Sequence, residues 1–259
     1  MQTVLFHSTV FGPIHSRRLG TSLGVNLSPD DGKVCSFDCL YCEAGFNAQG
    51  TGTTGLPSRE KVRRDLEQRL SAMSEAGQPL DVITFSGNGE PTMHPDFEGI
   101  IDDTVALRDR YFPHVCISVL TNSTRLDRPD VVRALRRVDN NILKLDSAID
   151  STMRAIDRPV GASFSVDAAV RGIAQFGRRA VIQTMFVRGS HNGVDVDNTT
   201  DAEIDALIDA YRRIGPGSIM IYSLDRPTPA GGLHRVGPDE LRTIADRIHA
   251  ATGIPVTTA

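Results

Sequence analysis

The chain has 259 residues, of which 40% are hydrophobic and 23% are charged, a composition typical of a globular protein with one sizeable core. This excludes collagen-like, disordered and small disulfide-stapled proteins. With 28 basic against 32 acidic side chains, the formal net charge is −4, which argues against a protein that depends mainly on contacts with phosphate groups.

Short β-branched or apolar runs alternate with longer amphipathic runs along the chain. In chain order, the expected strand and helix pairs are 23–27 with 58–76, 81–86 with 96–110, 115–121 with 128–138, 142–146 with 164–177, 180–187 with 201–214, and 218–224 with 238–251. A strand followed by a helix, six times over, is the pattern of βα units with a parallel sheet. We therefore expect one α/β domain over residues 1–259.

Two segments lie outside these pairs. Residues 1–22 form an N-terminal extension with a basic pair, Arg17 and Arg18, which is either a solvated surface or a binding group for a substrate or cofactor carboxylate. Residues 44–57 are rich in Gly and Thr and are expected to form a flexible loop. Its glycines match G-x-G-x-x-G, but no hydrophobic strand precedes them, which argues against a dinucleotide site.

Three of the four cysteines, Cys35, Cys39 and Cys42, fall within eight residues directly after the first expected strand. The fourth, Cys116, has apolar neighbours in an expected strand, so we expect a buried core thiol. In a reducing compartment such a cluster binds metal or performs redox chemistry more often than it forms disulfides. A structural zinc site normally has four protein ligands, whereas three thiolates on one loop suit a four-iron, four-sulfur cluster with one open iron.

The segment Cys35-Ser-Phe-Asp-Cys39-Leu-Tyr41-Cys42 resembles the cluster-binding motif of the radical S-adenosylmethionine (SAM) superfamily, including the aromatic residue before the last cysteine. The resemblance implies that the three cysteines bind a 4Fe-4S cluster and that Tyr41 lies at the cofactor.

A second motif, Ser-Gly-Asn-Gly-Glu-Pro-Thr at 86–92, follows the second expected strand. It resembles the Gly-Gly-Glu element with which that superfamily contacts the amino group of the methionine moiety. Asn88 stands where the first glycine of the element would be, while Gly87, Gly89 and Glu90 remain. All four are candidate cofactor-binding residues.

The resemblance implies an α/β fold, a partial (β/α)6 barrel with parallel strands. It further implies an oxidoreductase-like enzyme that cleaves SAM reductively to a 5′-deoxyadenosyl radical, which abstracts hydrogen from an unidentified substrate. The electron would come from a low-potential donor of the flavodoxin or ferredoxin type. Segments 12–20 and 223–229 more specifically resemble a small subgroup related to the core domain of wybutosine-type tRNA-modification enzymes.

Further candidates come from positions at strand ends, where the site of a βα barrel assembles. Asn122 ends the third expected strand and Asp146 the fourth, so both are candidates for contact with the cofactor's ribose or carboxylate. Lys144 shares the fourth strand, and the alternative is that Lys144 and Asp146 form a buried, mutually satisfied pair. Gln183 and Met185 are expected to face the barrel interior.

Other polar residues near strand ends have no assigned role. Arg188 and His191 are in the loop after the fifth expected strand, where substrate contacts are common, although a lone loop histidine is more often solvated. Arg226 follows the sixth strand and is more simply part of a turn.

Three other functions stay open: a glycyl-radical-enzyme activase, a tRNA base-modifying enzyme, and a non-catalytic zinc-binding module. The charge balance favours a small-molecule or protein substrate over tRNA. No apolar stretch approaches the roughly 18 residues that would cross a bilayer, and the start of the sequence lacks the features of a secretory signal. We therefore expect a cytoplasmic protein without a membrane partner.

Overall fold

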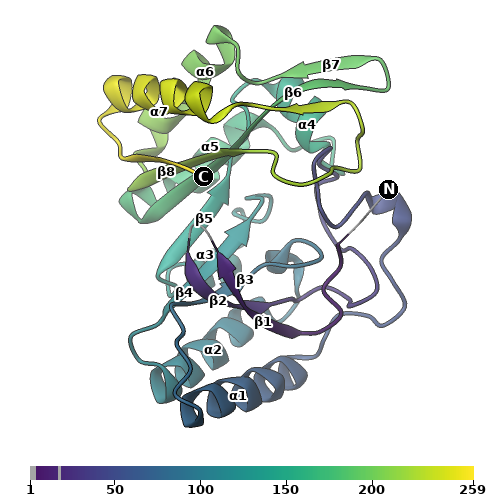
Figure 1. Ribbon diagram of the computed structural model, residues 1–259, viewed down its shortest axis with the longest axis vertical. Helices are drawn as coiled ribbons and strands as arrows, with labels where there is room; N and C mark the ends of the chain where they lie inside the picture. The colour runs from purple at the N-terminus through teal and green to yellow at the C-terminus, as the bar shows by residue number, and fades with distance from the viewer. Residues whose placement is uncertain (1–3, 17–18) are drawn as a thin grey trace.

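The computed structural model describes residues 4–16 and 19–259, and its centre is one ten-stranded sheet (Figure 1). The strands are β1 (Val10–Ser16), β2 (Gly20–Val25), β3 (Val82–Phe85), β4 (Cys116–Thr121), β5 (Asn140–Lys144), β6 (Ala180–His191), β7 (Val194–Asp197), β8 (Ser218–Ser223), β9 (Leu233–Arg235) and β10 (Val256–Thr258). They run in the order β1-β2-β3-β4-β5-β6-β8-β10, and β7 and β9 pair with the end of β6.

The pairs from β2 to β10 along this path are all parallel, and only β1 joins it antiparallel. In the described part of the chain the two edge strands do not pair with each other, so the barrel stays open. The expected partial barrel with parallel strands is therefore confirmed. All six expected strands lie on this path, together with β1 and β10.

Seven α-helices surround the sheet in the described chain. They are α1 (Arg59–Glu75), α2 (Phe97–Tyr111), α3 (Pro129–Leu135), α4 (Asp150–Asp157), α5 (Val166–Ala174), α6 (Asp201–Ile214) and α7 (Pro238–Thr252), with short 3-10 turns η1 (Asn47–Gln49), η2 (Pro91–Met93) and η3 (Gly177–Arg179). Helix α1 begins where the sequence predicts, because the Ser58 hydroxyl accepts a hydrogen bond from the Lys61 N–H at 3.2 Å. None of these helices is long and apolar enough to cross a membrane.

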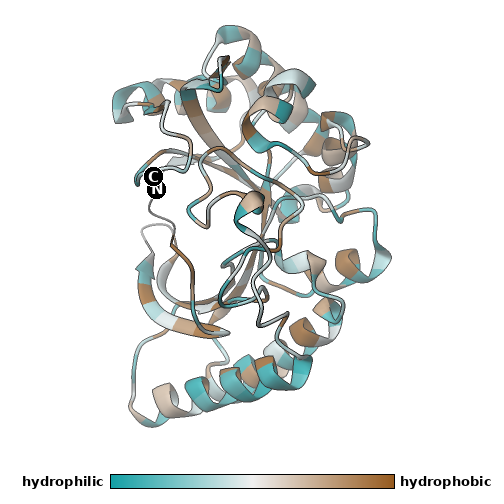
Figure 2. Ribbon diagram, turned by 90° about the vertical axis from the view of Figure 1, so that its right-hand side faces the viewer, coloured by the Kyte–Doolittle hydropathy of each residue, from teal (hydrophilic) through white to brown (hydrophobic). Residues whose placement is uncertain are grey.

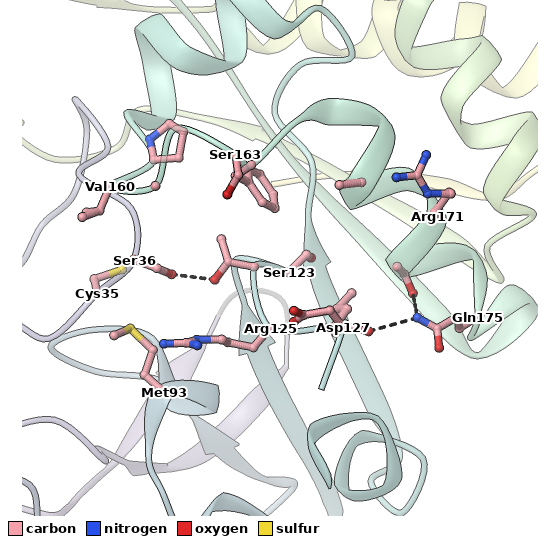
Figure 3. Close-up of a pocket in the computed structure, with 17 residues that line it drawn as sticks. Cys35, Ser36, Met93, Ser123, Arg125, Asp127, Val160, Ser163, Arg171 and Gln175 are labelled. Atoms are coloured by element: carbon pink, nitrogen blue, oxygen red, sulfur yellow. Dashed lines mark hydrogen bonds between the residues drawn. The ribbon is translucent and has the colours of Figure 1, made fainter. Parts of the chain in front are cut away.

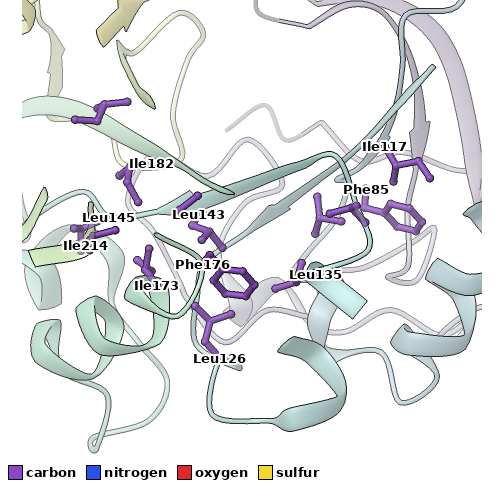
Figure 4. Close-up of a cluster of buried hydrophobic side chains, with 14 of the residues drawn as sticks. Phe85, Ile117, Leu126, Leu135, Leu143, Leu145, Ile173, Phe176, Ile182 and Ile214 are labelled. Atoms are coloured by element: carbon purple, nitrogen blue, oxygen red, sulfur yellow. The ribbon is translucent and has the colours of Figure 1, made fainter. Parts of the chain in front are cut away.

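The main core lies between the sheet and the helices (Figure 4). Along β5, successive side chains point alternately to the helix-covered face of the sheet and to the inside of the barrel. Leu143, and Leu145 just beyond the strand, pack in this core, whereas Ile142 lines a cavity inside the barrel. Figure 2 shows α1 as mainly teal, in keeping with the many charged residues of this helix.

The sequence did not predict strands β1, β7, β9 and β10 or helix α4. Strand β1 lies within the expected N-terminal extension, and its Pro13 fits an edge strand that lacks one donor. Strands β7, β9 and β10 have only three or four residues each, too few for a period to show. Helix α4 was missed because its eight residues lie close after a strand.

The segment 44–57 is a loop, as expected, but it is tied to the chain before it. The Asp31 carboxylate accepts hydrogen bonds from the Thr53 N–H at 2.8 Å and the Thr54 hydroxyl at 2.9 Å. The Lys33 N–H donates to the Gly50 carbonyl at 3.2 Å. A 3-10 turn and not a strand precedes the three glycines, in keeping with the rejection of a dinucleotide site.

Candidate functional site

The carboxyl ends of β3, β4 and β5 meet the cysteine loop at one edge of the sheet. Because these strands are parallel and adjacent, the residues that follow each of them come together there. Glu90, Asn122 and Asp146, three of the predicted site residues, lie at these three strand ends. The structure thus brings the two sequence motifs to one place.

The cysteine loop is held from two sides by backbone hydrogen bonds. On one side, Val34 forms an isolated parallel bridge with Gly89, and the Glu90 N–H donates to the Val34 carbonyl at 2.9 Å. On the other, the Leu40 N–H donates to the Ile156 carbonyl at 2.9 Å, at the end of α4. Inside the loop the buried Lys33 ammonium donates to the Gly45 carbonyl at 2.8 Å.

The three thiols of the loop differ in exposure, since Cys39 is buried whereas Cys35 and Cys42 are partly exposed. Burial, with a smaller contribution from Glu90, raises the pKa of Cys35 to about 12. Burial likewise raises the pKa of Cys39 well above its usual value. Both groups are therefore protonated thiols in the metal-free protein, and metal binding would displace their protons.

The spacing of these thiols bears on the kind of metal centre they suit. In the described chain, no three His, Cys, Asp or Glu side chains converge closely enough to bind a single metal ion. A structural zinc site normally has four protein ligands. In an iron–sulfur cluster with several irons each thiolate binds a different iron, and three thiols on one loop suit such a cluster with one iron left open.

The structure corrects the expectation that the fourth cysteine is buried. Cys116 is exposed and not a core thiol. It is the first residue of β4, at the amino end of the strand, while the inward-facing neighbours that suggested burial, Val115 and Ile117, point the other way. It therefore lies at the end of the sheet opposite to the cysteine loop.

Close packing explains two glycines of the second motif. A Cβ on Gly89 would lie 1.9 Å from the Val34 carbonyl oxygen, so only glycine allows the bridge to the cysteine loop. Gly87 has φ +145°, and a Cβ there would lie 2.4 Å from Asn26 Oδ1. The two loops therefore require glycine for their mutual approach, independently of any ligand.

Asn88 has a role that the sequence analysis did not foresee. Its fully buried side chain accepts from the Phe6 N–H at 2.8 Å and donates to the carbonyls of Phe6 and Pro29, both at 2.9 Å. Towards the cysteine loop it offers only its backbone carbonyl, which accepts from the Val34 N–H at 3.3 Å. The side chain holds the N-terminal segment, so Asn88 remains a candidate cofactor residue through its backbone alone.

Glu90 is buried and its carboxylate accepts four hydrogen bonds. Oε1 accepts from the Thr92 N–H and hydroxyl, at 3.1 and 2.5 Å, and from the Thr121 hydroxyl at 2.6 Å. Oε2 accepts only from the Asn122 N–H, at 2.7 Å. Burial raises the pKa of Glu90 and these hydrogen bonds oppose the rise. Oε2 keeps acceptor capacity for a further donor.

Asn122 links this carboxylate to the first cysteine. Its side-chain amide donates to the Ser36 hydroxyl at 2.9 Å and lies 3.6 Å from Cys35 Sγ. The Phe37 N–H approaches the same sulfur at 3.5 Å. Cys35 is thus the cysteine with two donors already directed at its sulfur.

A second buried polar cluster lies on the other side of the cysteine loop. The Lys144 ammonium donates to the Tyr41 hydroxyl and pairs with Asp146, and it lies 2.9 Å from Asp157 Oδ1. Tyr41 also donates to Asp146, so the pairing of Lys144 with Asp146 that the sequence allowed is present. Asn198 fixes this region by donating to the Asp146 carbonyl at 2.7 Å.

Charge balance in this cluster is set by burial and by neighbours. Burial works to lower the pKa of Lys144, but the two carboxylates overcome it and hold this pKa well above its usual value. Burial raises the pKa of Asp157 to about 7, against the opposing effect of Lys144. The sequence analysis missed Asp157 because it lies in α4, an element that was not expected.

The remaining candidates lie apart from these groups or outside the described residues. The Arg188 guanidinium pairs with Glu240 and donates to the Thr199 hydroxyl at 2.8 Å. The His191 ring contacts Phe46 at a centroid distance of 5.7 Å. Arg226 pairs with Glu43, just after the cysteine loop, at 2.6 Å. Arg17 and Arg18 lie outside the described residues.

A cavity of about 340 Å³ occupies the interior of the partial barrel. Every strand from β2 to β8 on the central path contributes alternate residues to its lining: Ser22, Thr84, Leu120, Ile142, Gln183, Met185, Met220 and Tyr222. Gln183 and Met185 therefore face the interior as expected. The candidate Arg226 also lines this cavity, and the rest of the wall is formed by Ile14, His15, Leu19, Glu43, Ser86, Ser223, Asp225 and Ala259. Through Glu43, the residue after Cys42, this interior cavity reaches the end of the cysteine loop.

Comparisons with known proteins place the chain in a family. Residues 31–210 match the model described as the radical SAM superfamily. A curated relative, the UPF0026 protein of Helicobacter pylori, is 26% identical over 223 residues, which cover 85% of this chain and 67% of the relative.

Two solved structures show the same fold. A radical SAM methyltransferase from Sphaerobacter thermophilus matches with a TM-score of 0.65 and 21% identity, over 92% of this chain and 65% of that chain. TYW1, an enzyme of wybutosine synthesis solved with a lysine-pyruvate adduct bound, matches with a TM-score of 0.61 and 15% identity, over 90% of this chain and 75% of that chain. This chain thus spans about two thirds of the methyltransferase chain.

Proposed function

This chain belongs to the radical SAM superfamily, and we propose that Cys35, Cys39 and Cys42 bind three irons of the family's 4Fe-4S cluster. Enzymes of this superfamily use that cluster together with SAM. When bound, the cluster supplies the electron that cleaves SAM reductively to methionine and a 5′-deoxyadenosyl radical. The observation that carries the proposal is a loop with three free thiols that is bridged directly to the second motif through Val34 and Gly89.

Glu90 and its neighbours would hold the amino group of SAM. Glu90 Oε2 has acceptor capacity left, and the three donors on Oε1 keep the carboxylate in place. The backbone of Gly87, Asn88 and Gly89 lines the same approach. Positioning of this kind keeps the reacting sulfonium beside the cysteine loop.

Asp146 would accept from the ribose hydroxyls of SAM, with Tyr41 and Asn122 beside it. Asp146 is engaged with Lys144 and Tyr41, so this role requires the cluster of side chains to rearrange. Asp157 makes that change less costly because Lys144 keeps a carboxylate partner at 2.9 Å when Asp146 turns away. No buried cation is then left unpaired.

We assign the substrate to the interior cavity and infer that it is small, or is a single side chain of a protein. Its volume of about 340 Å³ is at the lower end of the roughly 300–1,000 Å³ usual for ligand pockets. The electron would come from a low-potential donor of the flavodoxin or ferredoxin type.

The test is metal analysis of anaerobically reconstituted protein. We expect about four irons and four sulfides per chain, and loss of the intact cluster in Cys35→Ala, Cys39→Ala and Cys42→Ala. Cys116→Ala is the matched control and should keep the full iron content, because Cys116 lies at the far end of β4. Strong reductant with SAM should yield 5′-deoxyadenosine from the unaltered protein and from this control.

Two results would contradict the assignment. One is a full cluster in Cys39→Ala. The other is colourless protein with stoichiometric zinc and no sulfide, which would restore the zinc-binding module.

A further inference from the structure

A second cavity, of about 670 Å³, lies between the cysteine loop and α5 (Figure 3). Its walls are the loop after β4, the loop between α4 and α5, and one face of α5. It shares no lining residue with the interior cavity. Cys35 and Ser36 of the cysteine loop also line it.

One cation of this second cavity, Arg125, has no side-chain partner among the described residues. Arg125 is half-buried, and Figure 3 shows its side chain extended towards Met93, below Cys35 and Ser36. No hydrogen bond or ion pair of its guanidinium occurs among the described residues, and the acidic lining residue Asp127 makes none with it. Arg171, the other lining cation, already pairs with Asp167.

A partly desolvated guanidinium without an acceptor is unfavourable, and an anion would relieve the cost. A single planar guanidinium matches a singly charged carboxylate, which it can bind through two parallel hydrogen bonds. A phosphate dianion would leave charge uncompensated, because no second free cation lines the described wall.

Much of the remaining lining is apolar. Met93, Leu126, Val160 and Phe164 contribute to it, and Val160 is 69% exposed, the most exposed of the large hydrophobic side chains described. Apolar surface left open at the mouth of a cavity is typical of a ligand site and costs free energy until it is covered.

We propose that this second cavity binds a small aromatic or branched carboxylate, with the carboxylate on Arg125 and the apolar body against Val160 and Phe164. The site goes beyond the proposed function. It touches the cysteine loop at Cys35, but none of its lining residues belongs to the interior cavity or to the groups assigned to the amino group and ribose of SAM.

The experiment is calorimetric titration of the cluster-loaded protein with two matched probes, 2-naphthoate and its uncharged amide, 2-naphthamide. We expect saturable 1:1 binding of the carboxylate. Arg125→Gln should weaken it by about tenfold or more while leaving the weaker binding of the amide unchanged. Ala168→Leu, which extends a lining side chain of α5 into the cavity, should weaken both probes.

Two controls keep the outcome clear. Arg178→Gln removes an exposed charge outside the cavity and should change neither titration, and iron content should be equal in all variants. Saturating SAM should leave naphthoate binding unchanged. Equal naphthoate affinity in Arg125→Gln and the unaltered protein would overturn the site, and displacement by SAM would show that the second cavity belongs to the cofactor instead.

Discussion

At the end of β3, Glu90 combines a buried carboxylate with donors from three neighbours, and this determines what the residue can do. The Thr92 and Thr121 hydroxyls and two backbone N–H groups fix its orientation. The carboxylate is therefore preorganised, because its orientation is already fixed before a ligand ammonium group binds. Its effect on binding therefore depends on charge more than on shape.

The corresponding prediction is for Glu90→Gln, which keeps the size of the side chain and removes its charge. SAM affinity of the cluster-loaded protein should fall by about 1.5–3 kcal/mol, the usual contribution of a hydrogen bond to a charged group. Calorimetry measures it. Glu98→Gln, which removes a partly exposed carboxylate of α2 that pairs with Arg133 of α3, is the control. Unchanged affinity in Glu90→Gln would show that the second motif does not hold the cofactor.

At the scale of elements, the N-terminal segment is joined to the site by contacts far apart in sequence. The Val4 N–H donates to the Glu43 carbonyl at 2.9 Å, and the Thr9 carbonyl accepts from the Asn26 N–H at 2.8 Å. The Phe6 ring stacks on Phe11 of β1 at a centroid distance of 3.7 Å. Asn88 completes this attachment from the second motif. The segment thereby fixes the start of β1, whose Ile14 and His15 line the interior cavity.

We therefore predict that Asn88→Ala loosens the N-terminal segment. It leaves the Phe6 N–H and two carbonyls without their partners, which should lower the free energy of unfolding by about 2–4 kcal/mol. Chemical denaturation measures this loss, and hydrogen exchange should rise at residues 4–9. Asn140→Ala, which removes one hydrogen bond to the Ser118 hydroxyl, should cost only about 1 kcal/mol. Equal losses in the two variants would contradict the anchoring role.

At the scale of the whole molecule, many of the positive charges on the helices are balanced locally. Arginines of α1, α2, α3, α6 and α7 face carboxylates, for example Arg59 with Asp103 at 2.7 Å and Arg247 with Asp205 at 2.6 Å. Paired arginines release fewer counterions from a nucleic acid than free ones do. With a net charge of −4, this argues against docking of a whole tRNA on this chain.

We predict that the protein binds bulk tRNA no more tightly than the roughly 10⁻⁴–10⁻⁶ M typical of non-specific binding at physiological salt. Filter binding over a salt series tests this. A submicromolar affinity that falls steeply with salt would favour a tRNA-modifying function instead.

The sequence alone was enough for features that are encoded locally. The cysteine spacing, the glycines before Glu90, and the six strands with their helices depend on residues close together in the chain, whose periodicity and spacing persist whatever the rest of the molecule does. The meeting of the strand ends also followed, because parallel order brings them to one edge.

The tertiary structure alone decided the features that depend on distant partners. Asn88 is hydrogen-bonded to Phe6, 82 residues away in the sequence, and Lys144 to Tyr41, 103 residues away. Asp157 pairs with Lys144 from α4, a helix that the hydrophobic pattern of the sequence did not predict. Cys116 is exposed because of its place at a strand start, and the second cavity with Arg125 exists only where three loops and a helix meet. No local period or spacing encodes such contacts, since they arise from the packing of elements whose order in space is not their order in the chain.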